Sequence, residues 1–187
     1  MSTFVNAFTR QLDRAYFYMP TQENIRQGGQ ALSETIVRTA PFFLSPLETG
    51  AGVAVLHSAL RATTQETSFT QAIARGLARA GGATIASAAI HTAQKILSDE
   101  QTDYTTKLLL SMGVLSGGLV ISSWVDLSLR SVLENTSWPS PARLKRTGKI
   151  HMVAGVVAGL GLAAASPVTL GVMLGGSTLI RSLMSRN

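Results

Sequence analysis

The residue types that could perform catalysis or bind a metal are few in this chain and far apart. There is no cysteine, which removes thiolate metal sites, disulfide bonds and cysteine nucleophiles. The three histidines, His57, His91 and His151, fall in different segments without the spacing of a metal site. No phosphate-binding loop and no serine, histidine and aspartate set is suggested. We therefore expect no catalytic residue, no metal site and no cofactor, and the chain is predicted not to be an enzyme.

Glycine shows a more regular spacing than any reactive side chain. Pairs four residues apart occur three times in the C-terminal half, at Gly113 and Gly117, Gly155 and Gly159, and Gly171 and Gly175. Such a pair lies on one helix face and lets another backbone approach closely, which drives helix association in lipid. Two interpretations stay open: the pairs seal the helices of this chain to one another, or some of them dock on a partner subunit.

A basic segment between two apolar segments is the second regular feature. Its cations are Arg143, Lys145, Arg146 and Lys149. Such a cluster beside an apolar segment attracts anionic lipid headgroups, which would be cardiolipin in a mitochondrial membrane. An ordinary loop that sets the topology is an alternative. A nucleic-acid patch is disfavoured because Trp138 is the only aromatic residue nearby, and we expect no nucleic-acid partner.

The elements that carry these glycines and cations are predicted to be membrane helices. Of the 187 residues, 45% are hydrophobic and only 14% are charged, where soluble domains carry about 25% charged residues. Aromatic residues are scarce at 6%, whereas there are 17 glycines. This composition is typical of helices that meet at small residues in lipid. The net charge of +6 sits between and beyond the apolar segments, as it does in membrane proteins.

Four apolar segments in the C-terminal part are predicted to span a bilayer. They cover residues 77–97, 108–125, 150–165 and 167 to about 183. The second holds no charge between Lys107 and Asp126, and Trp124 at its end suits a membrane interface. Ser166 and Pro167 divide the last apolar block into a hairpin, because proline is tolerated in the first turn of a helix but not inside one. A single kinked helix is the alternative.

Charge placement favours four spans. The loop over residues 126–149 is basic, whereas the loop over residues 98–106 holds Asp99, Glu100 and Asp103. With four spans, the N-terminal part, the basic loop and the tail share one side of the membrane. The positive-inside rule puts that side towards the cytoplasm or the matrix.

Residues 1–69 are predicted to be a helical extension of the membrane domain at 70–187. Residues 1–16 have the pattern of an amphipathic helix for targeting or for docking, with an apolar face at Phe4, Val5, Phe8, Leu12 and Tyr16. Gly28 and Gly29 are predicted to break the helix that follows. Pro41 and Pro46 then introduce an apolar run, residues 51–60, that is too short to span and is predicted to be buried or interfacial.

A series of motifs over residues 70–187 is similar to a known family. It contains a GxxxG helix, an LAA stretch, a Pro-Val pair and a glycine pair, at Gly155, Gly159, Leu162, Ala163, Ala164, Pro167, Val168, Gly171, Gly175 and Gly176. Upstream groups are Gly81, Gly82, Ala83, Gln94 and Lys95, and then Gly117, Gly118, Leu119 and Asp126. Together they resemble the helices of the mitochondrial TIM preprotein-translocase family. The resemblance implies a glycine-rich, all-α, four-helix transmembrane bundle in the mitochondrial inner membrane.

Two departures from the family pattern shape the expected function. Family members usually carry an arginine in the turn after the LAA stretch, where this chain has Ala165 and Ser166. Their basic loop lies between the first and second helices, where this chain has an acidic loop. The resemblance then implies the non-translocating branch, an accessory subunit in the membrane arm of respiratory complex I.

We therefore expect a structural accessory subunit of an inner-membrane respiratory complex, and of complex I in particular. Its role would be assembly, stability and lipid or supercomplex contacts. Other membrane subunits of a large complex and a phospholipid, cardiolipin, would be its partners. The alternatives are a component of a TIM-type preprotein translocase and a cationic, holin-like protein that permeabilises membranes.

Overall fold

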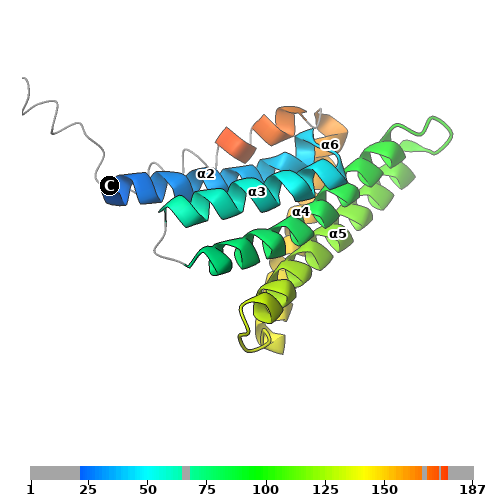
Figure 1. The fold of residues 1–187 in the computed structure, drawn as a ribbon. Coiled ribbons are helices and arrows are strands. Elements are labelled where there is room, and N and C mark those ends of the chain that lie inside the picture. Colours follow the sequence, from blue (N-terminus) through cyan, green and yellow to red (C-terminus); the bar gives the residue numbers. More distant parts are fainter. Residues whose placement is uncertain (1–21, 65–67, 166–167, 173, 177–187) are drawn as a thin grey trace, which may run out of the picture.

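The computed structural model describes residues 22–64, 68–165, 168–172 and 174–176, and it is helical throughout these ranges apart from short connections (Figure 1). The helices are α2 Gln22–Phe43, α3 Pro46–Thr64, α4 Phe69–Leu97, α5 Tyr104–Leu133 and α6 Pro141–Ala164. Two short helical segments, 168–172 and 174–176, follow α6. No strand occurs in the described ranges, so the predicted all-α class is confirmed for this part of the chain.

Side chains at the helix ends explain where α3 and α5 begin and where α5 stops. At the start of α3, a Glu48 carboxylate oxygen accepts the Ser45 backbone N–H at 3.0 Å, which is the capping-box arrangement. At the start of α5, the Asp103 carboxylate accepts the backbone N–H of Thr106 at 2.9 Å. Asn135 follows α5 in a left-handed conformation, φ 50°, which asparagine tolerates better than most residues.

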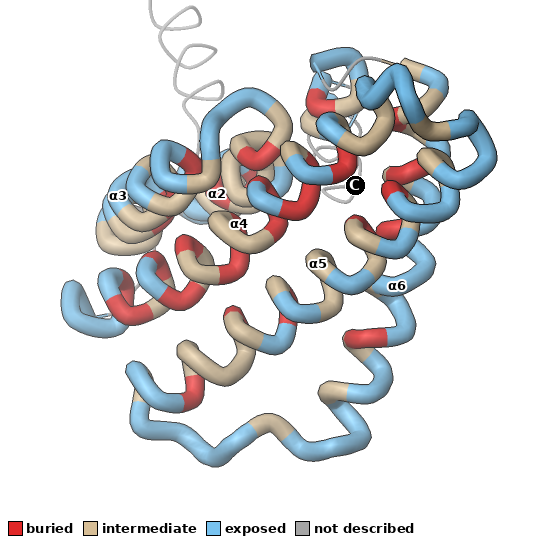
Figure 2. Tube along the Cα trace, turned by 90° about the vertical axis from the view of Figure 1, so that its right-hand side faces the viewer, coloured by how far each residue is buried: buried red, intermediate tan, exposed pale blue. Residues whose placement is uncertain are grey.

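α4 is the central helix of the bundle, packed between α3 and α5 (Figure 1). It has twelve buried residues, whereas α5 has five and α6 has four. Eleven of the twelve are alanine, glycine or serine, and Ile90 is the exception. Figure 2 shows the same contrast, with buried positions along α4 and mostly exposed or intermediate ones along α6. Because small side chains fill little space, neighbouring helices approach α4 closely.

α2 and α3 form an antiparallel hairpin that lies against α4 (Figure 1). Val53 of α3 is fully buried and packs with Ala80 of α4. At the turn of the hairpin, the backbone oxygen of Leu44 accepts hydrogen bonds from Ser87 at 3.0 Å and from His91 at 3.1 Å. The apolar run 51–60 therefore belongs to a helix that packs on α4, one of the two environments predicted for it.

The predicted helix break at Gly28 and Gly29 is wrong. α2 runs without interruption through both glycines, and Pro41 lies in its last turn. A glycine costs about 1 kcal/mol in a helix interior, but tertiary packing offsets this cost. Ala31 and Ser33, one turn further on, are buried in the bundle. The predicted amphipathic helix over residues 1–16 lies outside the described residues.

Within the described ranges, α5 and α6 are the two helices long and apolar enough to cross a membrane. They contain the predicted span 108–125 and, apart from its last residue, the predicted span 150–165. The predicted span 77–97 is helical throughout as part of α4, but α4 does not reach the same apolar character, because its apolar residues are mostly alanine. Of the three predicted spans that the structure fully describes, two therefore meet this criterion; the fourth, from residue 167 to about 183, lies partly outside the described residues.

The last apolar block is divided where the sequence predicts. α6 ends at Ala164, and Ala165 adopts an extended conformation, φ −143° and ψ 158°. A single kinked helix across this block is therefore wrong. Of the predicted fourth span, residues 168–172 and 174–176 are described and helical. These short segments lie beside α2 (Figure 1).

Candidate functional site

Gly155 and Gly159 of α6 lie directly against the backbone of α5. A Cβ atom on Gly155 would be 2.5 Å from the backbone nitrogen of Ser116, and one on Gly159 would be 3.0 Å from the Cα of Met112. At the same contact, the Ser116 hydroxyl donates a hydrogen bond to the backbone oxygen of Met152 at 3.1 Å. No side chain fits between these helices at the two glycines, so the pair makes an intramolecular contact.

Gly113 and Gly117 of α5 have a different environment. Both are exposed, and a Cβ atom on either would have no atom of the described residues within 4 Å. The interpretation that every glycine pair seals the helices of this chain therefore fails for this pair. The reason is geometric: α5 meets α4 and α6 on two of its faces, and Gly113 and Gly117 lie on neither.

The neighbouring Gly118, which is outside the four-residue spacing, faces α4 instead. A Cβ atom there would collide with Ala89. Further along the same contact, a Cβ atom on Gly82 would be 2.9 Å from the backbone oxygen of Ser122. The Ser122 hydroxyl donates a hydrogen bond to the backbone oxygen of Gly82 at 2.7 Å. The contact between α4 and α5 thus depends on single glycines opposite small residues, which the search for glycine pairs missed.

Gly171 and Gly175 lie against α2. A Cβ atom on Gly171 would be 2.6 Å from the ring of Phe43, and one on Gly175 would be 2.9 Å from the Thr39 methyl group. The partners here are side chains rather than backbone, so this contact can yield more easily than the contact at Gly155.

The predicted lipid-binding cations lie on the first turns of α6. Arg143, Lys145, Arg146 and Lys149 are all exposed. Three of the four, without Arg143, line an open depression on one side of the helix. The structure therefore separates the four residues into three that share a surface and one that lies beside it.

Trp124 of α5 marks the same level of the bundle. Its indole N–H donates a hydrogen bond to the backbone oxygen of Leu144 at 3.1 Å, and a Cβ atom on Gly148 would be 3.4 Å from its ring. The ring is still 42% exposed. An indole with one polar contact and an exposed apolar face suits an interface between water and lipid.

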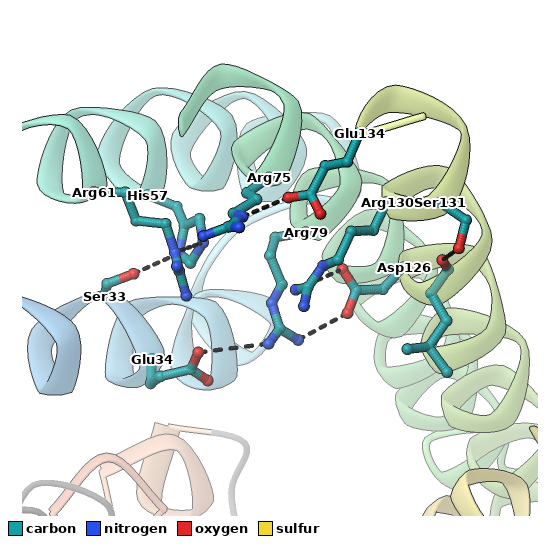
Figure 3. Close-up of polar contacts among 11 residues, drawn as sticks. Ser33, Glu34, His57, Arg61, Arg75, Arg79, Asp126, Arg130, Ser131 and Glu134 are labelled. Carbon is teal, nitrogen blue, oxygen red and sulfur yellow. Dashed lines mark hydrogen bonds and ion pairs between the residues drawn. The ribbon is translucent and has the colours of Figure 1, made fainter. Parts of the chain in front are cut away.

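Charged side chains of α2, α4 and α5 meet in a cluster beyond the glycine contacts (Figure 3). Arg79 of α4 lies between Asp126 of α5, at 2.9 Å, and Glu34 of α2, at 3.5 Å. Arg75 of α4 pairs with Glu134 near the end of α5. Arg130 approaches Asp126 from the same helix at 3.9 Å. The cluster therefore joins three helices through side chains.

Of these charges, the sequence singles out Asp126 alone, as the residue that ends an apolar segment and as a position of the family resemblance. The ion pairs of Arg75 and Arg79 join residues 45 to 59 positions apart, and no local pattern shows which charges will meet. The one available signal is that acidic Asp126 ends the apolar segment of α5 on the side that is otherwise basic.

His57 is buried beside this cluster and is held as a neutral imidazole. Arg61 donates a hydrogen bond to His57 Nε2 at 3.0 Å, so Nε2 must accept and Nδ1 carries the proton that faces Ser33. Burial, followed by the nearby charges of Arg61 and Arg79, lowers the pKa of His57 to about 4. A neutral histidine between a serine and an arginine links α2 to α3.

The other two histidines lie apart from this cluster and from each other. His91 bonds to the oxygen of Leu44, and His151 bonds to the Thr147 oxygen of its own helix at 2.9 Å. In the part of the chain that the structure describes, no three histidine, aspartate or glutamate side chains converge to hold a metal ion. The geometry in these ranges suits helix association and surface binding.

The charge-free parts of α5 and α6 lie side by side. α5 has no charged residue between Lys107 and Asp126, and α6 has none after Lys149. Because Gly148 packs on Trp124, Lys149 is close to the level of Asp126. The two helices therefore share a layer without charge that is about 22 Å long, at 1.5 Å per residue over residues 150–164 of α6, and the charge-free segment of α5, residues 108–125, is about 27 Å long.

Comparison with known proteins adds no relative: no family model, no curated protein and no solved structure matches the chain.

Proposed function

We propose that this chain is a non-catalytic integral membrane subunit that stabilises a larger complex. The observation that carries the proposal is the exposure of its two most apolar helices. Only 22% of the most apolar 18-residue window is buried in α5, and the same share in α6. A core helix of a soluble protein with this composition is mostly buried. Apolar faces of such length, left uncovered by the described part of the chain, favour lipid or a partner chain as their neighbour.

The charge-free layer supports the same conclusion. Its length is about 22 Å, and the charge-free segment of α5 alone, at about 27 Å, is close to the ~30 Å hydrocarbon thickness of a bilayer. α4 has no charge between Arg79 and Lys95, and the pair of Arg79 with Asp126 puts its boundary at the same level as that of α5. We extend the proposal to four spans: α4, α5, α6 and the predicted span from residue 167 to about 183, of which residues 168–172 and 174–176 are described.

Charge asymmetry gives the orientation within this proposal. The segment from Asn135 to Lys149, which comprises the connection after α5 and the first turns of α6, contains four cations and no acid, whereas the loop between α4 and α5 contains Asp99, Glu100 and Asp103. The positive-inside rule puts the basic loop towards the matrix or the cytoplasm.

The hairpin of α2 and α3 presents a surface of mixed character. Phe43, Leu47 and Val55 are exposed on it, and so are the charged residues Arg38 and Glu48. Exposed charges cost several kcal/mol in hydrocarbon, so lipid is a poor neighbour for this surface. A protein partner with its own polar groups fits better, which favours a subunit of an assembly over a free-standing bundle.

The choice of complex comes from the resemblance to the TIM preprotein-translocase family. That resemblance supports the mitochondrial inner membrane. The departures at Ala165 and Ser166 and in the acidic loop favour an accessory subunit of a respiratory complex, and complex I in particular. The work assigned to the chain is then assembly, stability and lipid or supercomplex contact.

Extraction of membranes tests the first half of the proposal. An epitope-tagged chain expressed in its own cells should remain in the pellet after alkaline carbonate treatment and should be released by detergent. Release into the aqueous fraction by carbonate alone would overturn the proposed integral membrane location.

Native electrophoresis tests the second half. After mild detergent extraction, the chain should comigrate with NADH dehydrogenase activity, and mass spectrometry of the band should identify respiratory subunits. Migration apart from all respiratory complexes would overturn the assignment. Crosslinking to an arrested precursor protein would instead support a preprotein translocase.

A further inference from the structure

We infer that the first turns of α6 form a binding site for an anionic phospholipid, an inference that rests on the proposed membrane location. The site is the open depression lined by Ala142, Lys145, Arg146, Lys149 and Ile150. These positions recur every three or four residues, so they lie on one side of the helix. The opposite side, which carries Gly148, packs on α5. The depression therefore faces away from the bundle.

The cations of the depression are not neutralised by the described part of the chain. No described carboxylate lies within ion-pair distance of Lys145, Arg146 or Lys149, whereas Arg75 and Arg79 at the same end of the bundle are both paired. Three adjacent positive charges at an interface attract anionic lipid by about 1 kcal/mol each. The ligand must supply the negative charge that the chain does not.

The surface below the cations is apolar and continuous with them. Ile150, Val153, Val157 and Leu160 are between 49% and 65% exposed and continue the same side of α6 towards Ala164. Cations above an exposed apolar stripe match the two parts of a phospholipid, with the phosphate at Lys145 to Lys149 and an acyl chain along the stripe. A soluble phosphate would use the cations alone.

Trp124 places this depression at the depth of the lipid headgroups. Trp124 bonds to Leu144, between the first two cations of α6, and its exposed ring suits the headgroup level.

The amides at the helix start are not the binding groups in this inference, because the Ser140 side chain already accepts a hydrogen bond from the Arg143 amide. The side chains of the second and third turns carry the site.

Arg143 provides a matched control for Arg146. Both are exposed arginines on the first turns of α6, three positions apart, but only Arg146 lines the depression. We expect Arg146→Gln to weaken binding of tetraoleoyl cardiolipin about fivefold, the equivalent of ~1 kcal/mol. The triple variant K145Q/R146Q/K149Q should weaken it about a hundredfold, and Arg143→Gln by less than twofold.

Native mass spectrometry of the detergent-solubilised full chain, titrated with cardiolipin, measures these affinities, and circular dichroism checks that each variant is folded. Equal weakening by Arg143→Gln and Arg146→Gln would overturn the site and leave only diffuse surface charge. Equal binding of phosphatidylcholine would also overturn it. Displacement of cardiolipin by glycerophosphate at similar concentration would show a phosphate site without an acyl part, and would overturn the lipid assignment.

The failure of this inference differs from failure of the proposed function. A chain that stays in carbonate-washed membranes and comigrates with a respiratory complex, but binds lipid equally with either arginine removed, loses the site and keeps the function. A chain released by carbonate loses both.

Discussion

Two of the contacts between helices in this bundle, which we call the glycine joint and the ionic joint, are made in opposite ways. In the glycine joint, Gly148, Gly155 and Gly159 of α6 lie against α5, and at Gly155 backbone meets backbone. In the ionic joint, Glu34 of α2, Arg75 and Arg79 of α4, Asp126 and Arg130 of α5, and Glu134, the residue after α5, meet through long side chains (Figure 3). Gly155 and Gly159 lie within the charge-free layer, and the ionic joint lies at its boundary.

The difference predicts different sensitivities. Contact between backbones has no spare volume, so the glycine joint should be intolerant of any added side chain and indifferent to pH. Ion pairs between flexible side chains tolerate changes in shape but depend on charge. A substitution in one joint can be made without changing any residue of the other.

The largest effect is expected from Gly155→Val in the glycine joint. The added side chain would collide with the backbone of Ser116, which cannot move unless α5 and α6 separate. Overpacking of this kind costs typically 1–3 kcal/mol and more where backbone must shift, so we expect a loss of about 3 kcal/mol. Thermal unfolding of the detergent-solubilised chain measures it. A melting temperature equal to that of the unchanged chain would contradict the close contact.

Acid should loosen the hairpin of α2 and α3 without affecting the glycine joint. The pKa of His57 is lowered to about 4 from its ordinary value near 6.5, so between these pH values the unfolded chain binds a proton that the folded chain does not. The free energy of unfolding then has its full value above pH 6.5 and falls as the pH drops towards 4, by at most about 3 kcal/mol. Protonation would also place a positive charge against Arg61, which donates to the same ring.

Hydrogen exchange, corrected for its intrinsic pH dependence, measures this effect helix by helix. Protection of α2 and α3 should fall between pH 7 and pH 4.5, while protection at the contact between α5 and α6 should not. His57→Gln should remove most of this pH dependence, whereas His151→Gln, a histidine bonded within its own helix, should retain it. An identical acid response in His57→Gln would exclude His57 as its source.

Asp126→Asn should weaken the ionic joint by about 2 kcal/mol. The substitution keeps the shape of the side chain but leaves Arg79 and Arg130 without their common partner. Breaking a buried pair costs about 3–5 kcal/mol, and we take a lower figure because both arginines are more than a quarter exposed. Chemical unfolding measures the loss.

The control for Asp126 is Glu23, which pairs with Arg26 on the surface of α2. Both side chains of this pair are about half exposed, so Glu23→Gln should leave the free energy of unfolding nearly unchanged. Equal losses in the two variants would mean that burial adds nothing to the pair of Arg79 with Asp126.

The two joints also differ in how far the sequence predicts them. Four-residue spacing identified Gly155 and Gly159 because glycine repeated at this period has a direct geometric consequence. The same spacing could not distinguish Gly113 and Gly117 from Gly118, since every face of this helix carries small or apolar residues and periodicity gives no direction. The break after Ala164 was predictable because proline restricts its own backbone and that of the residue before it.

The ionic joint could not be read from the sequence, because its partners come from separate helices. Arg79 and Asp126 are 47 positions apart, and which charges meet depends on how α4 and α5 are offset along their axes. Gly28 and Gly29 show the opposite limit: local propensity predicts a break, but burial of the next turn of α2 overrides it. Local signals therefore predict helix ends and contact residues better than the pairing of helices.

The smallest effect on stability, and the sharpest test of the glycine joint, is expected at Gly117. It shares the glycine spacing of Gly155 but has open space where a side chain would lie, so Gly117→Leu should change the melting temperature of the isolated chain by an amount equivalent to less than about 0.5 kcal/mol. If a partner subunit covers this face, Gly117→Leu should still remove the chain from its complex on a native gel, whereas Gly117→Ala should not, because alanine also permits close helix approach. A loss of stability in the isolated chain as large as that of Gly155→Val would mean that another part of this chain covers the face. Full assembly of the Gly117→Leu variant into the complex would indicate that lipid, and not a partner subunit, lies against this face.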